Sequence, residues 1–234
     1  MGEQYNKALA IQIEKLGTDH IDTAASYNNI GQVFNELSEY DRALENYNKA
    51  LDIWKRILGN YHLYTAISYN SIGVVYFNQG KCDKALDYFY KALDIRKEKL
   101  GVNHPNTAFT YNNIGSVYDE IGNNDEALKY YNKALEIYET VLGTYHFYTA
   151  TFYNNIGFVY SKQGKYDKAL EYYNKALDIR EKTLGCNHLD TATSCNNIGV
   201  IYKKQGEYDK ALKYLEKALA VREKNLGNDH PRTQ

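Results

Sequence analysis

The sequence predicts an all-α fold, a right-handed superhelical solenoid of antiparallel helix pairs with about 11 helices. Two observations predict it. Residues of several kinds recur at a fixed step of 42 residues along the 234-residue chain, and the apolar residues between them keep a helical spacing. The chain has only two prolines, which suits a helix-rich fold because proline is tolerated only near a helix start.

The 42-residue step holds throughout the chain. One histidine, one glycine and one threonine per unit keep it: His20, His62, His104, His146, His188 and His230; Gly17, Gly59, Gly101, Gly143, Gly185 and Gly227; Thr23, Thr65, Thr107, Thr149, Thr191 and Thr233. Because one inserted residue would break these series, we expect five full units, over residues 17–58, 59–100, 101–142, 143–184 and 185–226. We expect residues 1–16 to be the partial second helix of a preceding unit, and residues 227–234 to start a truncated one.

Each unit is predicted to hold a helix A, a short turn and a longer helix B. In the second unit, Tyr69, Ile72, Gly73 and Tyr76 fall at i, i+3, i+4 and i+7, on one face of helix A. Helix B follows and ends near Gly101, since glycine after the last apolar residue is a typical helix stop.

Small residues are expected where helices A and B approach closely. A glycine in mid-helix A costs about 1 kcal/mol relative to alanine, and it recurs as Gly31, Gly73, Gly115, Gly157 and Gly199. A penalty repeated in this way indicates a packing reason. Alanines of helix B are expected opposite these glycines, at Ala43, Ala85, Ala127, Ala169 and Ala211, with aromatic residues such as Phe34 and Tyr76 in the adjoining layer.

These residues resemble a known repeat family. In the fourth unit the chain matches the tetratricopeptide pattern of aromatic, Leu, Gly, Tyr, Ala, Phe and Ala with Tyr153, Ile156, Gly157, Tyr160, Ala169, Tyr173 and Ala176. The usual unit has ~34 residues, and residues 176–188 resemble the longer repeats of kinesin light chains. The resemblance implies that helix A lines a concave groove that holds an extended partner segment.

Asparagines mark the predicted groove. Two adjacent positions of helix A carry them in nine cases of ten: Asn28, Asn70, Asn112, Asn154 and Asn196 at the first, and Asn29, Ser71, Asn113, Asn155 and Asn197 at the second. An amide offers donors and an acceptor, so a ladder of amides could clamp a peptide main chain. The second set resembles the asparagine ladder of tetratricopeptide superhelices. Alternatively, one asparagine of each pair forms hydrogen bonds between neighbouring helices, and the sequence leaves both interpretations open.

Charged residues near the end of helix A differ between units. They are basic at Lys162, Lys203 and Lys204, but acidic at Glu36 and Glu120. The resemblance to kinesin light chains implies acidic, tryptophan-containing peptides bound by basic groove residues. A purely acidic ligand would therefore suit only the C-terminal half of this chain.

The remaining recurrent residues are interpreted as structural. Neighbouring repeats displace equivalent residues by roughly 10 Å, whereas zinc ligands lie about 2 Å from one ion, so one histidine per unit predicts loop residues and no metal site. The threonine three residues after each histidine is expected to help start helix A by satisfying free N–H groups. Cys195 replaces a tyrosine and is expected to be a small core residue.

Composition excludes several classes of function. With 28 basic and 29 acidic residues, the chain has no electrostatic footprint for nucleic acid. It has no run of ~20 apolar residues for a membrane span. No phosphate loop, nucleophile elbow or metal motif appears, so neither a cofactor nor enzymatic activity is expected. Three cysteines without CxxC spacing indicate a reducing, cytoplasmic location.

The sequence thus predicts a protein- or peptide-binding scaffold that uses the groove lined by helix A. The alternative is a structural module that associates with itself. Neither end shows a polar capping repeat, which solenoids need for solubility. We expect either a fragment of a longer array, or ends that stack on copies of the chain into oligomers or fibres.

Overall fold

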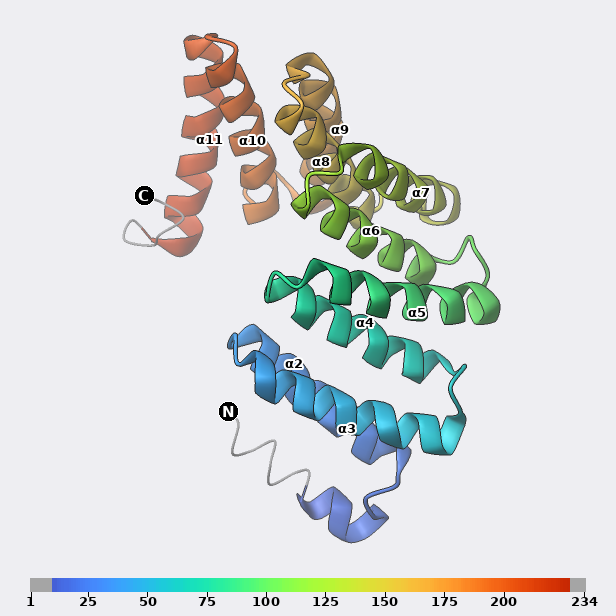
Figure 1. Ribbon diagram of the computed structural model, residues 1–234. Coiled ribbons are helices and arrows are strands. Elements are labelled where there is room, and N and C mark those ends of the chain that lie inside the picture. The colour runs from blue at the N-terminus through green and yellow to red at the C-terminus, as the bar shows by residue number, and fades with distance from the viewer. Residues whose placement is uncertain (1–9, 228–234) are drawn as a thin grey trace. The chain divides into compact units, whose positions relative to one another are not determined.

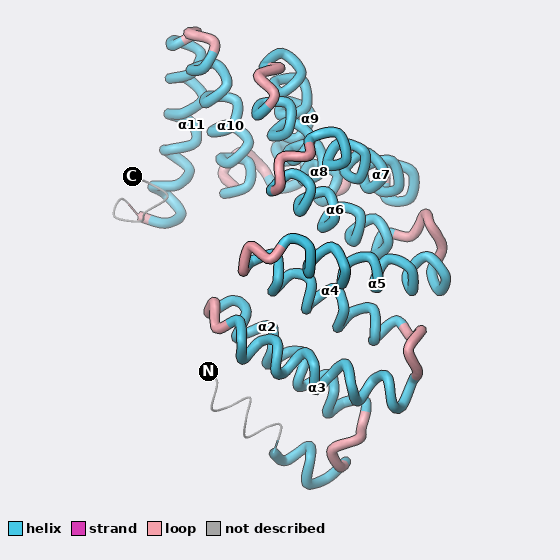
Figure 2. The backbone as a smooth tube through the Cα atoms, viewed as in Figure 1, coloured by secondary structure: helices cyan, strands magenta, loops and turns pink. Residues whose placement is uncertain are grey.

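The computed structural model describes residues 10–227 (Figures 1 and 2). Within this range the secondary structure is helical throughout, with a short helical segment over residues 10–16 and the helices α2 to α11. The predicted partial helix over residues 1–16 is therefore described only from residue 10. Residues 228–234 of the predicted truncated unit also lie outside the described range.

Short and long helices alternate along the chain. The short ones have 16 residues each and are α2 (Ile21–Glu36), α4 (Leu63–Asn78), α6 (Pro105–Glu120), α8 (Phe147–Lys162) and α10 (Leu189–Lys204). The long ones have 19 residues each and are α3 (Tyr40–Leu58), α5 (Cys82–Leu100), α7 (Asn124–Leu142), α9 (Tyr166–Leu184) and α11 (Tyr208–Leu226). We call these two sets the A helices and the B helices.

The 42-residue repeats fall into two larger parts of the chain, which we call unit 1 (residues 1–122) and unit 2 (residues 123–234). In unit 1, α2 packs on α3, α3 on α4, α4 on α5 and α5 on α6. In unit 2, α7 packs on α8, α8 on α9, α9 on α10 and α10 on α11. Within each unit, every helix thus packs against the next one along the chain, in antiparallel hairpins (Figure 1), which confirms the predicted all-α architecture of stacked helix pairs.

The core of each unit is shared between consecutive helix pairs. In unit 1, Tyr47 of α3 is buried in the same cluster as Ile30 of α2 and Ile72 of α4. In unit 2, Cys195 of α10 is buried in a cluster with Tyr173 of α9, as expected for a small core residue. Burial raises the pKa of the Cys195 thiol. Because one helix pair cannot cover its own apolar faces, adjacent pairs stabilise each other.

The glycines within the A helices admit side chains from the paired B helix. A Cβ atom at Gly73 would lie 2.7 Å from the ring of Phe89, and one at Gly157 would lie 2.9 Å from the ring of Tyr173. The close approach predicted from the sequence is confirmed. The nearest group is a ring four residues after the expected alanine, although the carbonyl of Ala169 also lies close to Gly157.

Each A helix starts with its histidine. The Nδ1 atom accepts a hydrogen bond from the backbone N–H two residues later, at 3.0 Å for His104 and 3.1 Å for His188, so the side chain satisfies a free helix N–H group. The expectation that threonine starts the helix was wrong. Thr107 Oγ1 instead donates to the carbonyl of Gly101 at 2.9 Å, which ties the loop to the end of the preceding B helix.

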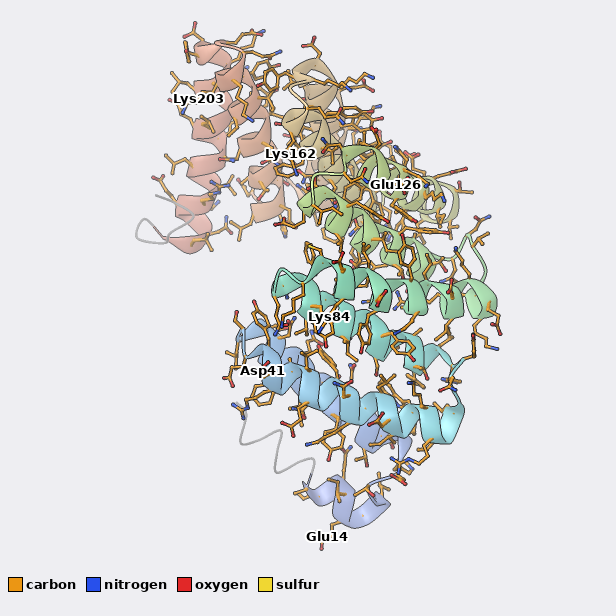
Figure 3. All side chains as sticks on the ribbon, viewed as in Figure 1. Glu14, Asp41, Lys84, Glu126, Lys162 and Lys203 are labelled. Carbon is orange, nitrogen blue, oxygen red and sulfur yellow. The ribbon has the colours of Figure 1, made fainter. Side chains whose placement is uncertain are left out.

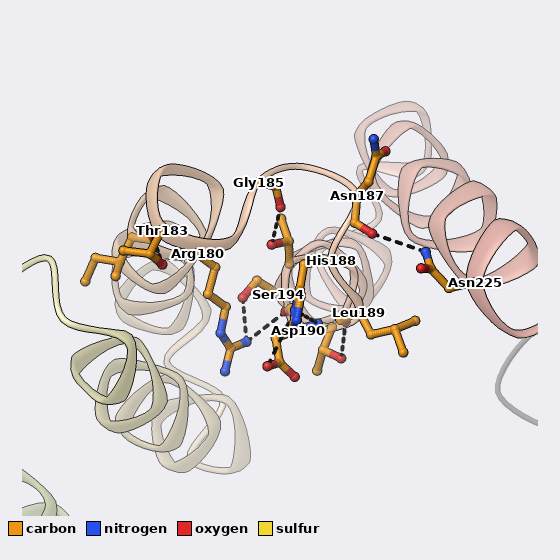
Figure 4. A network of polar contacts seen from close by, with 12 residues as sticks. Arg180, Thr183, Gly185, Asn187, His188, Leu189, Asp190, Ser194 and Asn225 are labelled. Carbon is orange, nitrogen blue, oxygen red and sulfur yellow. Dashed lines mark hydrogen bonds and ion pairs between the residues drawn. The ribbon is translucent and has the colours of Figure 1, made fainter.

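Two buried arginines join consecutive helix pairs. In unit 1, Arg96 of α5 donates to the carbonyl of Asn106 and to Thr110 on α6, at 3.0 and 2.5 Å. Burial lowers the pKa of Arg96 to about 10, so it remains charged at neutral pH. In unit 2, Arg180 of α9 reaches Asp190 and Ser194 of α10 in the same way (Figure 4).

Candidate functional site

The A helices present a stripe of side chains that are exposed or half-buried. We call it the A-helix stripe. It has four positions per helix, spaced i, i+4, i+7 and i+11, which lie on one helix face: Ala25, Asn29, Gln32 and Glu36 on α2; Ile67, Ser71, Val74 and Asn78 on α4; Phe109, Asn113, Ser116 and Glu120 on α6; Thr151, Asn155, Phe158 and Lys162 on α8; and Thr193, Asn197, Val200 and Lys204 on α10. None of these side chains is buried.

The asparagines at the predicted groove positions form pairs between neighbouring A helices. In unit 1, Asn113 Nδ2 of α6 donates to Asn70 Oδ1 of α4 at 3.0 Å. In unit 2, Asn197 Nδ2 of α10 donates to Asn154 Oδ1 of α8 at 2.8 Å. In both pairs, the donor is the stripe asparagine of the later helix. The acceptor is the asparagine that directly precedes the stripe position on the earlier helix.

A second row of contacts lies two turns further along the A helices, between α2 and α4 in unit 1 and between α8 and α10 in unit 2. Asn78 Nδ2 donates to Asn35 Oδ1 at 3.1 Å in unit 1, and Lys204 Nζ donates to Ser161 Oγ at 3.4 Å in unit 2. Polar side chains thus link the A helices at two levels. This arrangement fixes the spacing and the orientation of the stripe that each unit presents.

Ser71 interrupts the series of amide pairs. Its counterpart on the preceding helix, Asn28, has a buried Oδ1 atom with no hydrogen-bond partner among residues 10–227, because serine is too short to supply the donor that asparagine provides elsewhere. Ser71 lies close to the phenol of Tyr47 instead. Burial raises the pKa of Tyr47 to about 12, and the contact with Ser71 acts in the opposite direction.

The pairs use part of each amide group. In a pair such as Asn70 with Asn113, one donor and one acceptor are occupied, which leaves the Nδ2 atom of Asn70 and the Oδ1 atom of Asn113 for other partners. Asn196 lies beside Asn197 and accepts from Arg222 Nη1 at 3.4 Å. The predicted residues Asn112 and Asn155 are half-buried on α6 and α8. Contacts between helices therefore account for part of the pattern, and a role in holding a peptide remains a prediction.

The predicted basic residues lie at the C-terminal ends of two A helices. Lys162 of α8 and Lys203 of α10 are exposed (Figure 3), as is Lys204. The ammonium group of Lys162 lies 5.7 Å from the centre of the Phe158 ring, a distance at which the ring stabilises the charge. Unit 2 therefore places a positive group directly beside an exposed aromatic one.

Exposed apolar residues of the stripe were not among the predicted site residues. In unit 2, Phe158 is 48% exposed and Val200 is 37% exposed, whereas in unit 1 the exposed apolar residues are Ile67 and Phe109. They occupy positions whose residue type varies from repeat to repeat, and this variation was the only sign in the sequence that they could contact a partner. Recognising them required the solvent exposure of each helix face.

Residues 10–227 hold neither a cluster of metal ligands nor a membrane-spanning helix. Among residues 10–227, no group of three or more His, Cys, Asp or Glu side chains is placed to hold a metal ion. No helix in this range is both long enough and apolar enough to cross a bilayer.

Family models agree with the observed helix pairs. A tetratricopeptide repeat model matches residues 2–56, 33–98, 64–140, 148–224 and 194–233, and a second one matches residues 113–182. The chain belongs to the tetratricopeptide repeat family. No match was found among curated proteins.

Solved structures of other tetratricopeptide proteins share the fold. The crystal structure of BtubC (BKLC) from P. vanneervenii is 21% identical, with a TM-score of 0.79, over 98% of this chain and 91% of that one. A putative kinesin light chain from Podosopora anserina, with nearly identical TPR-like repeats, is 19% identical with a TM-score of 0.72, over 88% and 98%. YrrB, described as having an unusual peptide-binding site, is 24% identical with a TM-score of 0.51, over 100% and 97%. The expected resemblance to kinesin light chain repeats is therefore confirmed at the level of the fold.

Proposed function

We propose that this tetratricopeptide protein is a scaffold that binds an extended segment of a partner protein along the A-helix stripe. The observation that carries the proposal is the stripe itself. It combines exposed apolar side chains with amide groups that keep unused donors and acceptors, on helices whose spacing is held by polar contacts. Main-chain groups of an extended peptide require such donors and acceptors, and its side chains require apolar contacts.

The two units favour different parts of a partner. In unit 2, Phe158 and Val200 offer apolar contact, and Lys162 and Lys204 follow at the ends of their helices. This combination suits an apolar side chain followed by an acidic one, because a carboxylate gains a charge-assisted bond from an ammonium group. In unit 1 the stripe ends in Glu36, Asn78 and Glu120, which does not suit an acidic segment.

The test is a selection of peptides from a random display library on the immobilised chain. Selected peptides are expected to carry Asp or Glu, and the double variant Lys162→Glu/Lys204→Glu is expected to bind them at least tenfold more weakly. The matched control is Lys165→Glu/Lys213→Glu, which makes the same charge change at exposed residues outside the stripe. Equal losses in both variants, or none in the first, would show that the peptides bind elsewhere.

One observation favours the alternative of self-association. Leu219 of α11 is 40% exposed, whereas Leu177, the equivalent residue of α9, is 8% exposed beneath the next helix pair. Leu212 of the same helix is 56% exposed. Burial of such apolar surface against a second copy would be favourable.

Sedimentation over a wide range of protein concentration distinguishes the two functions. Self-association through α11 predicts oligomers that Leu219→Lys dissociates, while Lys213→Glu on the same helix leaves them intact. A chain that stays monomeric at the highest concentration excludes the alternative and leaves the scaffold proposal unaffected.

A further inference from the structure

Lys182 of α9 occupies a small site formed by its own chain. Its ammonium group lies 2.8 Å from Asp178 Oδ2 and donates to the hydroxyl of Tyr145 at 2.9 Å. The same group lies 4.5 Å from the centre of the Tyr145 ring. A carboxylate, a phenol oxygen and an aromatic ring thus contact one exposed primary ammonium group, and each of these groups attracts cations.

Unit 1 carries the equivalent tyrosine and aspartate without the cation. Two repeat lengths earlier in the chain, Tyr61 and Asp94 stand where Tyr145 and Asp178 stand in unit 2, but Glu98 replaces Lys182. Neither Tyr61 nor Asp94 forms a hydrogen bond or an ion pair within residues 10–227. Glu98 interacts with its neighbour Lys99 at 2.9 Å. The site therefore has a second acidic group in place of the ammonium group.

A cavity lies at this position in unit 1. It has a volume of about 230 Å³ and is lined by Asn60, Tyr61, Tyr69, Lys91, Asp94 and Ile95. Tyr61 is 61% exposed, so a ligand reaches its ring from solvent. The cavity lies between the loop before α4 and the middle of the B helix α5, and it shares no residue with the A-helix stripe.

Lys91 does not prevent a cation from binding here. Its ammonium group lies 4.8 Å from the centre of the Tyr88 ring and 6.0 Å from that of Tyr69. In unit 2 the equivalent Lys175 lies over the equivalent rings, at 5.0 and 5.7 Å. Lys175 pairs with Glu171 at 2.7 Å and Lys182 with Asp178 at 2.8 Å, so α9 carries both ammonium groups, each with its own carboxylate.

We propose that the cavity at Tyr61 and Asp94 binds a primary alkylammonium group from outside the chain, in the position that Lys182 occupies in unit 2. A lysine side chain of a partner protein and a free polyamine both supply this group. Asp94 accepts a hydrogen bond from the ammonium group, Tyr61 contributes its hydroxyl and its ring, and Glu98 adds negative charge. The inference is independent of the proposed function of the stripe.

The experiment is an NMR titration of the full chain carrying ¹³C-labelled tyrosine. The probe is an acetylated and amidated Gly-Lys-Gly peptide, with spermidine as the second arm. We expect saturable shifts of the Tyr61 ring with a Kd on the order of 1 mM, as befits a single exposed contact site. The same peptide with acetyl-lysine lacks the charge and is expected not to bind. Trimethyl-lysine keeps the charge but loses the N–H donors, and is expected to bind more weakly.

Three variants decide the outcome. Asp94→Asn is expected to weaken binding at least fivefold, and Glu98→Lys is expected to abolish it because the new side chain fills the site as Lys182 does. Lys182→Glu is expected to open a second site, so that the Tyr145 ring also responds to the probe. Circular dichroism of each variant verifies that the helices are retained.

The two probes also identify the source of the ammonium group. Binding of the lysine peptide supports a site for a protein side chain, and binding of spermidine alone supports a site for free polyamines. The proposal is overturned if neither probe gives a saturable shift of Tyr61, or if Glu98→Lys binds the probes as tightly as the original chain.

Discussion

Units 1 and 2 have the same backbone plan but differ in the side chains that they place on it. Both start each A helix with a histidine, and both join consecutive pairs through a buried arginine. They differ along the stripe, which ends in acidic or neutral groups in unit 1 and in lysines in unit 2. The recurrent residues therefore maintain the shared backbone, and the variable residues give each unit its own surface chemistry.

Alanine substitutions at the glycines of the A helices are expected to change stability most, and they test whether these glycines pack equally tightly in both units. In unit 1, Gly73→Ala is expected to destabilise the protein by about 2 kcal/mol, because the new Cβ atom would lie 2.7 Å from Phe89, a ring that is only 1% exposed. In unit 2, Gly199→Ala would meet the half-buried Leu215 at 2.8 Å, and this aliphatic side chain has more room to move.

Urea unfolding followed by circular dichroism measures both variants. A smaller loss for Gly199→Ala, of about 1 kcal/mol or less because Leu215 can shift away from the new Cβ atom, would support the comparison, since the gain in helix propensity is common to both variants. Equal losses would show that the glycine packing is equally strict in both units and that the ring of Phe89 tolerates no less than Leu215 does.

The second effect concerns the amide pairs, which are complete between α8 and α10 but interrupted at Ser71. Asn197→Ser in unit 2 is expected to cost about 1–2 kcal/mol, because it leaves the Oδ1 atom of Asn154 without its donor. Ser71→Asn in unit 1 is expected to stabilise by about 1 kcal/mol, since it supplies a donor to the unpaired Oδ1 atom of Asn28.

Thermal melting of both single variants gives the two signs directly. A destabilising Ser71→Asn would show that the contact of Ser71 with Tyr47 outweighs the missing amide pair. If Asn197→Ser does not change the melting temperature, the amide pair does not stabilise the fold, and contact with a partner would be the remaining role of the asparagines.

The frame was predictable because it follows from spacing along one chain. The 42-residue step and the helical periodicity predicted the helix pairs, and the glycine in mid-helix A predicted close packing. Assigning the helix start to histidine rather than to Thr107 was not possible from spacing, since both residues lie at the correct place and only the direction of each hydrogen bond separates them.

The candidate site was less predictable for a related reason. Whether Asn70 and Asn113 bond to each other or to a partner depends on the distance between neighbouring A helices, which no single helix contains. The exposure of Phe158 likewise follows from how helices pack and not from its own sequence neighbours. The residue type at its position varies between repeats, so the 42-residue periodicity did not predict an exposed aromatic side chain there.

Alanine substitutions at the capping histidines test whether these caps contribute equally to the stability of the two units. His62→Ala in unit 1 and His188→Ala in unit 2 are each expected to cost about 1 kcal/mol, since both lose a bond to a helix N–H group, at 3.2 and 3.1 Å. Asp190 lies 3.6 Å from His188, but this exposed contact is expected to add little.

Hydrogen exchange of the first-turn amides measures this effect locally. The control is His→Asn at the same positions, which keeps a capping acceptor and is expected to change stability by only a few tenths of a kcal/mol. Unequal losses would mean that the frame itself, and not only the stripe, differs between units.

The smallest effect concerns the turn between helices A and B. Ser38 in unit 1 has a φ of 59°, whereas the equivalent residues of the later repeats are all glycines, with φ values of 72° at Gly80, 79° at Gly122, 72° at Gly164 and 78° at Gly206. A residue with a side chain is strained in this left-handed region, so Ser38→Gly is expected to stabilise by about 0.5–1 kcal/mol. The reverse change in unit 2, Gly164→Ser, is expected to cost a similar amount, and chemical unfolding of the pair measures both. If Ser38→Gly instead destabilised the protein, the greater freedom of glycine in the unfolded chain would outweigh the relief of strain, and Ser38 would no longer count as a weak point of unit 1.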